Sequence, residues 1–196
     1  MLFTLVATCT PGPNNIMLLA SGMNYGIRRT IPHMLGIMVG FPSMVLLIGL
    51  GLAELFERQP LAYTILKVIC TLYLLFLAWK IATAESSHIT GREGHEAGKV
   101  STPLTFLQAA SFQWVNPKAW AMAISAISLY TQKDQPGTSI AIIALAFLLA
   151  SIPSVNIWTL FGQTLRRWLN DENRRRRFNW AAAALLVASL IPMLSL

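Results

Sequence analysis

The sequence predicts an all-α integral membrane protein whose six transmembrane helices form two inverted three-helix repeats, with the first and fourth helices broken. Three observations lead to this prediction. Of the 196 residues, 55 % are hydrophobic and only 12 % are charged, which is unusual for a soluble domain. Six apolar runs are long enough to cross a bilayer, and prolines interrupt the first and the fourth of them. Residues 1–196 are therefore expected to form a single transmembrane domain.

The six apolar runs each match the length of a membrane-crossing helix, which needs about 17–25 residues. Together they leave only short connections outside the bilayer. The predicted spans are residues 1–23, 31–53, 61–82, 104–127, 138–160 and 178–196.

The first span is interrupted near its middle by Pro11-Gly12-Pro13, which Asn14 and Asn15 follow. Proline lacks a backbone N–H and clashes with the preceding turn, so the helix must open here. In hydrocarbon an opened backbone is tolerated only where it faces protein or a water-filled cavity. The interruption therefore predicts a polar site at membrane depth, as in transporters that have discontinuous helices.

The fourth span has a second interruption, Asn116-Pro117-Lys118, which Gln113 precedes by three residues. A lysine at the centre of a transmembrane helix costs about 2.5–3.5 kcal/mol on insertion scales, so it normally has a partner or a function. Lys118 could bind a substrate carboxylate, or it could cap the carbonyl end of the half-helix that ends at Asn116. The sequence leaves both roles open.

The chain divides at a polar stretch, residues 85–102, into a first half (1–84) and a second half (103–196) with three spans each. An odd number of spans in each half gives the halves opposite orientations in the membrane, as in inverted-repeat transporters. The second span of each half also contains a proline, Pro42 or Pro153. The matching positions of these helix breakers, rather than sequence identity, predict the repeat and make residues 85–102 a cytoplasmic linker.

Small and aromatic residues indicate how the spans pack and where they end. Gly36 and Gly40 are four residues apart in the second span, a spacing that lets helix backbones approach closely. We expect them to serve helix packing and not to contact substrate. Trp79 and Trp158 fall near predicted cytoplasmic ends of spans, where an interfacial aromatic belt would place them.

The net charge of +7 reflects topology rather than a polyanionic partner. Most lysines and arginines lie in the first, third and fifth connections, so the positive-inside rule predicts that these are cytoplasmic and that both termini are periplasmic. Arg174 to Arg177 precede the last span and are expected to act as a topogenic signal, with an anionic-lipid anchor as the alternative. The predicted partner is the lipid bilayer, and no nucleic acid is expected.

The first interruption offers complementary partners for a zwitterion. N–H groups at the start of the half-helix after Pro13 favour a carboxylate, and the freed carbonyls before it favour an ammonium. A small amino acid is therefore the predicted cargo. Asn14 and Asn116 are expected to line the cavity or to tie the two interruptions together. Asn156, three residues after Pro153, is a further candidate, with packing or backbone capping as the alternative.

The candidate residues fall into two groups, one that contacts substrate and one that shapes the backbone. The predicted substrate-binding residues are Asn14, Asn15, Gln113, Asn116, Lys118 and Asn156. The predicted helix-breaking residues are Pro11, Gly12, Pro13 and Pro117.

Several kinds of catalytic chemistry are excluded by residue content. The predicted spans contain no aspartate or glutamate, so no buried carboxylate is available to carry a coupling proton. The chain has no Walker lysine motif, no HExxH pair and no Ser-His-Asp grouping within the membrane. We therefore predict no enzyme activity, no cofactor and no metal site.

Three segments resemble one known family. They are Thr10-Pro11-Gly12-Pro13-Asn14-Asn15, then Asn116-Pro117-Lys118-Ala119, and the third-span ending Leu72-Tyr73-Leu74-Leu75-Phe76-Leu77-Ala78-Trp79-Lys80. Together they resemble the lysine and homoserine/threonine exporter family, LysE/RhtB, over essentially the whole chain. The third-span ending is most similar to the cysteine/O-acetylserine exporter branch.

The resemblance implies export of amino acids or close derivatives across the bacterial inner membrane by alternating access, driven by an ion gradient. A proton is one candidate for the coupling ion, and the protein is expected to work as a monomer or a homodimer. The resemblance also implies that the two interruptions form the central site. An inorganic-ion exporter and a membrane assembly subunit without flux of its own are the alternatives.

Overall fold

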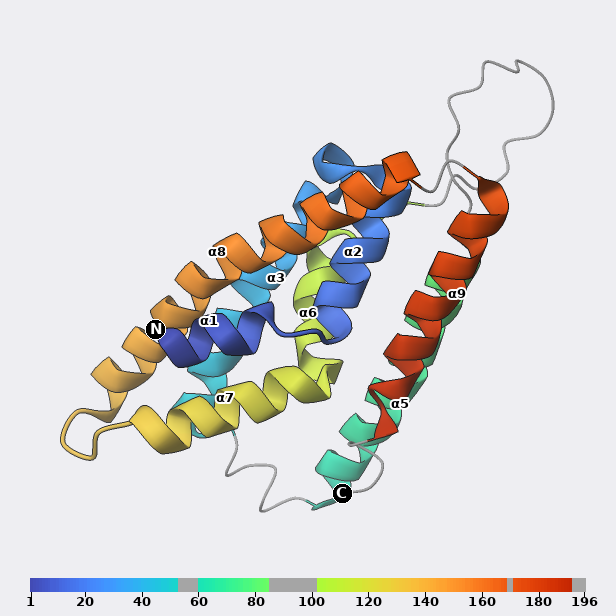
Figure 1. The fold of residues 1–196 in the computed structure, drawn as a ribbon. Helices are drawn as coiled ribbons and strands as arrows, with labels where there is room; N and C mark the ends of the chain where they lie inside the picture. The colour runs from blue at the N-terminus through green and yellow to red at the C-terminus, as the bar shows by residue number, and fades with distance from the viewer. Residues whose placement is uncertain (53–59, 85–101, 169–170, 192–196) are drawn as a thin grey trace.

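The computed structural model describes residues 1–52, 60–84, 102–168 and 171–191, and every regular element within these ranges is helical (Figure 1). The all-α prediction is confirmed for them. The predicted linker lies outside these ranges except for Thr102, as do residues 53 and 192–196 of two predicted spans. The elements are α1 (Leu2–Cys9), α2 (Pro13–Tyr25), α3 (Ile27–Leu47), the π-helix η1 (Ile48–Leu52), α5 (Pro60–Ala82), α6 (Phe106–Val115), α7 (Pro117–Tyr130), α8 (Pro136–Trp168) and α9 (Glu172–Ala188).

Two helical stretches among the described residues are long and apolar enough to cross a membrane. They are Ile27–Gly51 and Pro136–Arg166, whose mean hydropathies are 2.1 and 2.3, and Val68–Ala82 is a shorter apolar helix. The first and fourth predicted spans are instead pairs of short helices, α1 with α2 and α6 with α7. Each pair is divided at the predicted proline-containing interruption.

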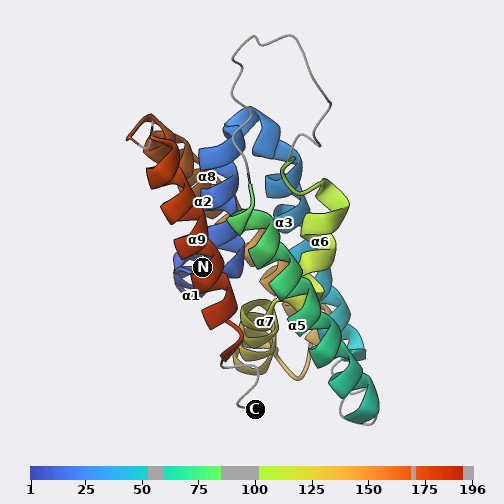
Figure 2. The same cartoon turned by 90° about the vertical axis from the view of Figure 1, so that its right-hand side faces the viewer.

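The long helix α8 organises the packing. Helices α1, α2 and α3 all pack against it, α6 packs against α3, and α5 and α9 pair along one side (Figures 1 and 2). Two apolar clusters fill the interior, one around Leu18 and Phe112 and the other around Phe41 and Phe147. The interruption between α6 and α7 falls between the two clusters, because α6 packs into the first and α7 into the second.

Glycines allow the closest helix contacts. A Cβ atom on Gly22 of α2 would collide with the carbonyl oxygen of Thr159 in α8, and one on Gly162 of α8 would collide with the carbonyl oxygen of Leu19. The backbones of α2 and α8 therefore touch directly at two points. Gly36 and Gly40 meet α6 in the same way, which agrees with the packing role expected for them.

Replacing Gly162 with alanine is expected to destabilise the protein, although alanine is the better helix former by up to about 1 kcal/mol. The added methyl group has no room against α2, and overpacking costs about 1–3 kcal/mol. The thermal unfolding midpoint in detergent should fall by about 5 °C. Gly137→Ala is the control, since nothing lies within 4 Å of a Cβ there. A midpoint that does not fall for Gly162→Ala would contradict the direct backbone contact.

The last helix begins earlier than its apolar run. Helix α9 starts at Glu172, because Asp171 caps it by accepting a hydrogen bond from the backbone N–H of Asn173 (3.1 Å). Arg174 to Arg177 therefore lie in the first turns of α9 and not in a connection before the span. This corrects the predicted boundary, because hydropathy locates the apolar part of a helix whereas capping determines where the helix begins.

Candidate functional site

The first interruption separates α1 from α2 at Thr10-Pro11-Gly12, with Pro13 as the first residue of α2. Opening the helix frees the carbonyl groups at the end of α1, which need hydrogen-bond donors in a buried setting. Asn15 supplies two, because its side-chain amide donates to the carbonyls of Thr8 (2.8 Å) and Thr10 (2.7 Å). The hydroxyl of Ser154 in α8 donates to the Thr8 carbonyl as well (2.8 Å).

The other carbonyls of this segment are also occupied. The indole N–H of Trp158 in α8 donates to the carbonyl of Cys9 (3.1 Å). Thr10 supplies donors for two carbonyls of the last turn of α1. Its backbone N–H donates to the carbonyl of Val6 (3.0 Å), and its hydroxyl donates to the carbonyl of Ala7 (2.9 Å). The end of α1 is thus held by polar side chains from α2 and α8.

Lys118 from the second interruption binds the first interruption. Its ammonium Nζ donates to the carbonyl of Thr10 (2.7 Å), to the Thr10 hydroxyl (2.8 Å) and to the carbonyl of Pro11 (3.3 Å). A cation at the carbonyl end of α1 is favoured by the helix dipole. Lys118 therefore acts as a cap, but on a helix of the other half of the chain and not on the half-helix that ends at Asn116.

The second interruption is built around Asn116 and Pro117. Asn116 ends α6, and its side-chain oxygen accepts a hydrogen bond from the backbone N–H of Lys118 (3.1 Å), so it also caps the start of α7. Pro117 occupies the first position of α7, where its missing N–H costs nothing. The same arrangement places Pro13 at the first position of α2.

Two reciprocal side-chain hydrogen bonds also join the two interruptions. The side-chain amides of Asn14 and Gln113 exchange hydrogen bonds of 2.9 and 3.1 Å, and Gln113 also donates to the carbonyl of Ala109 (2.8 Å). Gln113 is fully buried, so this pairing satisfies groups that would otherwise be costly. Two sets of side-chain contacts therefore link the interruptions, the Asn14–Gln113 pair and the bonds from Lys118 to Thr10 and Pro11.

A pocket lies between the interruptions and α3, α7 and α8. We name it the break pocket; its cavity volume is about 30 Å³, which is room for one or two water molecules. Asn14, Asn15, Asn116 and Lys118 all line it, and Gln113 lies behind Asn14. The other lining residues are Ala7, Thr8, Gly12, Ile37, Phe41, Met122, Ser151, Ser154 and Val155.

One end of this break pocket favours a negative charge. The ammonium of Lys118 packs against Gly12, and a Cβ there would lie 3.1 Å from Nζ. Within the hydrogen bonds of the described residues, the backbone N–H groups of Gly12, Asn14 and Asn15 at the start of α2 have no acceptor. Free N–H groups at a helix start together with a lysine suit a carboxylate.

The structure does not bring Asn156 to the other candidates. Its side-chain amide donates to the carbonyl of Ile152 in its own helix (2.8 Å), and it does not line the break pocket. This geometry matches the backbone-capping alternative.

Sequence reasoning missed the partners that α8 provides. Ser154 and Trp158 hold the end of α1, although Trp158 was expected in an interfacial belt. Trp79, by contrast, is 62 % exposed, as a belt residue would be. Two serines on either side of Pro153 in an apolar helix were the available signal, since hydroxyls in such a helix usually bond to backbone or to a neighbouring helix.

Comparison with known proteins identifies the family. Residues 5–189 match the LysE type translocator model. A cysteine/O-acetylserine efflux protein from Klebsiella pneumoniae subsp. pneumoniae is 33 % identical over 189 residues, covering 94 % of this chain and 90 % of that protein. The protein of the same description from Escherichia coli (strain K12) is 30 % identical over 188 residues, with the same coverage. No solved structure matches the chain.

These matches extend over nearly the whole chain and include both interruptions. Translocators of this kind move a solute and are not enzymes, so the prediction that the chain has no enzyme activity is confirmed. The resemblance seen in the three sequence segments is confirmed as well. The chain belongs to the LysE type translocator family.

Proposed function

We propose that this protein exports small amino acids of the size and charge of cysteine, or their O-acyl derivatives, across the bacterial inner membrane. The names of the similar proteins support the class of cargo. The observation that carries the proposal is the contact of Lys118 with Thr10 and Pro11, because it joins both interrupted helices at one polar pocket. The pocket chemistry matches a zwitterion, because it offers separate partners for the two charges, and the pocket has to widen to admit one.

In the proposed binding mode, the carboxylate of the cargo lies between the Lys118 ammonium and the free N–H groups at the start of α2. The ammonium of the cargo competes with Lys118 for the carbonyls of Thr10 and Pro11. In the structure Lys118 itself occupies these carbonyls. Lys118 would then move from a capping position to a carboxylate-binding position when cargo arrives, which combines the two roles that the sequence left open.

Alternating access by two inverted three-helix repeats, 1–84 and 103–196, is part of the proposal. Similar local chemistry in both halves supports it, since α2 and α7 each begin with a proline directly after an interruption. We further propose a periplasmic position for both termini, a proton as the coupling ion, and a homodimer as the assembly to test first. An asparagine-rich site without acidic groups would leave proton coupling to a basic side chain.

Transport in proteoliposomes tests the proposal. Vesicles that contain the purified protein and are loaded with unlabelled cysteine should take up radiolabelled cysteine by counterflow, and O-acetylserine should compete. Empty liposomes give the background. An assembly subunit would show no flux above this background, and an inorganic-ion exporter would show ion flux without amino-acid counterflow. Either result would overturn the proposed cargo.

Asn14→Ala should reduce the counterflow rate by about fivefold to tenfold, because the buried Gln113 amide loses Asn14 but keeps the Ala109 carbonyl, which places the cost at the lower end of about 1–3 kcal/mol. Asn173→Ala is the control, because it makes the same chemical change in the exposed first turn of α9, away from the pocket, and it should transport at the wild-type rate. Gel filtration of both variants checks that they fold. A wild-type rate in correctly folded Asn14→Ala would remove Asn14 from the proposed site.

A further inference from the structure

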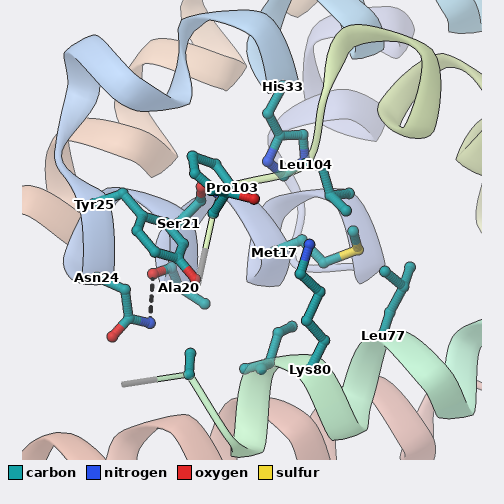
Figure 3. Close-up of a pocket in the computed structure, with 13 residues that line it drawn as sticks. Met17, Ala20, Ser21, Asn24, Tyr25, His33, Leu77, Lys80, Pro103 and Leu104 are labelled. Atoms are coloured by element: carbon teal, nitrogen blue, oxygen red, sulfur yellow. Dashed lines mark hydrogen bonds between the residues drawn. The ribbon is translucent and has the colours of Figure 1, made fainter. Parts of the chain in front are cut away.

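A second pocket lies between α2, α3, α5 and the segment before α6 (Figure 3). Its empty space is about 380 Å³, including its opening to solvent. The residues that matter below are His33 from α3, Lys80 from α5, and Ser21 and Asn24 from α2. None of these four lines the break pocket, so this is a separate space with its own polar groups.

His33 is the unusual member of this pocket. It is 1 % exposed, yet neither ring nitrogen has a hydrogen-bond partner. A buried polar group without a partner costs about 1–3 kcal/mol, so such groups in native proteins call for a physical explanation. Figure 3 shows the imidazole directed into the pocket, where a ligand could supply the missing bonds.

Lys80 reaches into the same pocket from α5. Figure 3 shows its ammonium on the side of the pocket where His33 and Pro103 lie. Among the described residues Lys80 has no hydrogen bond and no salt bridge, and its side chain is partly buried. A cation and an imidazole that share one space, without an acidic residue among the lining residues, favour an anionic ligand.

The rest of the wall limits what that ligand can be. Met17, Leu77 and Leu104 form an apolar side, and the hydroxyl of Ser21 and the amide of Asn24 form a short polar strip along α2. The amide of Asn24 is already held by the carbonyl of Ala20 (2.9 Å) and by Asn179 (3.0 Å). A carboxylate attached to a small, mostly uncharged body fits this combination better than a multiply charged anion does.

The two pockets lie along the same pair of helices. His33 is one helical turn from Ile37 on α3, and Ile37 lines the break pocket. On α2, Asn14 lines the break pocket, whereas Met17 and Ser21, one and two turns further, line the second pocket. The second pocket is thus displaced toward the α2–α3 connection, which the charge pattern predicts to be cytoplasmic.

We propose that Lys80 and His33 bind the carboxylate of the cargo at a first, cytoplasmic-side site, from which the cargo passes along α2 and α3 to the break pocket. The identity of the ligand rests on the proposed export function, but the preference for an anion rests on the pocket itself. Lys80 and His33 are substrate-binding residues of this first site, and they do not contact the break pocket.

Uptake into inside-out vesicles tests the first site, because it presents the predicted cytoplasmic face to the medium. Lys80→Met keeps the apolar stem and removes the charge. It should raise the KM for radiolabelled cysteine by about tenfold, since a hydrogen bond to a charged group contributes about 1.5–3 kcal/mol. The maximal rate should change little, because the break pocket is intact. His33→Asn, from a different helix, should raise KM in the same direction.

Two controls make the assignment specific. Lys133→Met removes an exposed lysine from the α7–α8 connection and should leave KM unchanged. Cysteine methyl ester lacks the carboxylate, so the KM for the ester should be the same in Lys80→Met and in wild type. If Lys80→Met raises both KM values equally, the carboxylate assignment is wrong. If neither KM changes in a correctly inserted variant, the first site is wrong.

Equilibrium binding of radiolabelled cysteine to the purified protein separates this inference from the export proposal. Binding that weakens in Lys80→Met, together with no transport by wild type, would support the site and overturn export. Transport with a KM and a Kd that do not depend on Lys80 would support export and overturn the site. Absence of both binding and transport would overturn both.

Discussion

Lys118→Met is expected to reduce amino-acid counterflow by at least about a hundredfold, the largest effect among the variants proposed for this chain. Two carbonyl groups at the end of α1 lose a charged donor, and each such bond contributes about 1.5–3 kcal/mol. The cargo carboxylate loses its proposed partner in the same change. Counterflow of radiolabelled cysteine in proteoliposomes measures the rate.

Two further variants identify the cause of the Lys118→Met effect. Lys133→Met removes an equivalent charge from an exposed connection and should transport at the wild-type rate. Lys118→Arg keeps a cation and should retain partial activity. If Lys118→Met transports normally after correct insertion, then the lysine is neither a required cap nor a cargo partner, and the central site must lie elsewhere.

Gly12→Val is expected to reduce counterflow by about thirtyfold, corresponding to a loss of about 2 kcal/mol when the flexible Lys118 side chain is displaced from its carbonyl partners. Gly12 has an extended backbone (φ −178°), so valine meets no conformational barrier there. Its Cβ would instead lie 2.6 Å from Cδ of Lys118, which forces the lysine off the Thr10 and Pro11 carbonyls. Transport by the purified variant measures the effect.

A double-mutant comparison tests whether Gly12 acts through Lys118. Once Lys118 is methionine, adding Gly12→Val should cost little further activity, because the displaced ammonium is already absent. Gly137→Val, where a side chain has open space, is the matched control and should be active. Fully additive losses would mean that Gly12 affects transport by a route independent of the lysine.

The helix interruptions were predictable from sequence because their cause is local. Proline removes an N–H group and favours the first position of a helix, and the structure divides the first and fourth spans directly before Pro13 and Pro117, after the cap residues Gly12 and Asn116. The expectation that Pro42 and Pro153 are also helix breakers is wrong, because both lie inside continuous helices. The expected meeting of both interruptions at one pocket also agrees with the structure, through Lys118 and the Asn14–Gln113 pair. Residue type and position along the spans were sufficient to predict that the two interruptions meet.

The donors that complete the site were not predictable in the same way. Ser154 and Trp158 are far from Thr8 and Cys9 in sequence, and only the packing of α1 on α8 brings them together. The partners of the Lys118 ammonium could not be predicted for the same reason, since Thr10 and Pro11 are far from it in sequence. A single chain shows which carbonyls are freed by a proline, but the side chain that satisfies them depends on tertiary contacts.

Glycine contacts between α2 and α8 have a consequence for how this protein can change shape. With Gly22 against Thr159 and Gly162 against Leu19, a slip of one residue would bring a bulky side chain onto a carbonyl oxygen. These contacts fix the register of α2 against α8, so we expect the two helices to move together as one rigid unit. In the proposed alternating-access cycle, we expect the rearrangement where α9 meets α2, because that contact is smaller than the contact between α2 and α8.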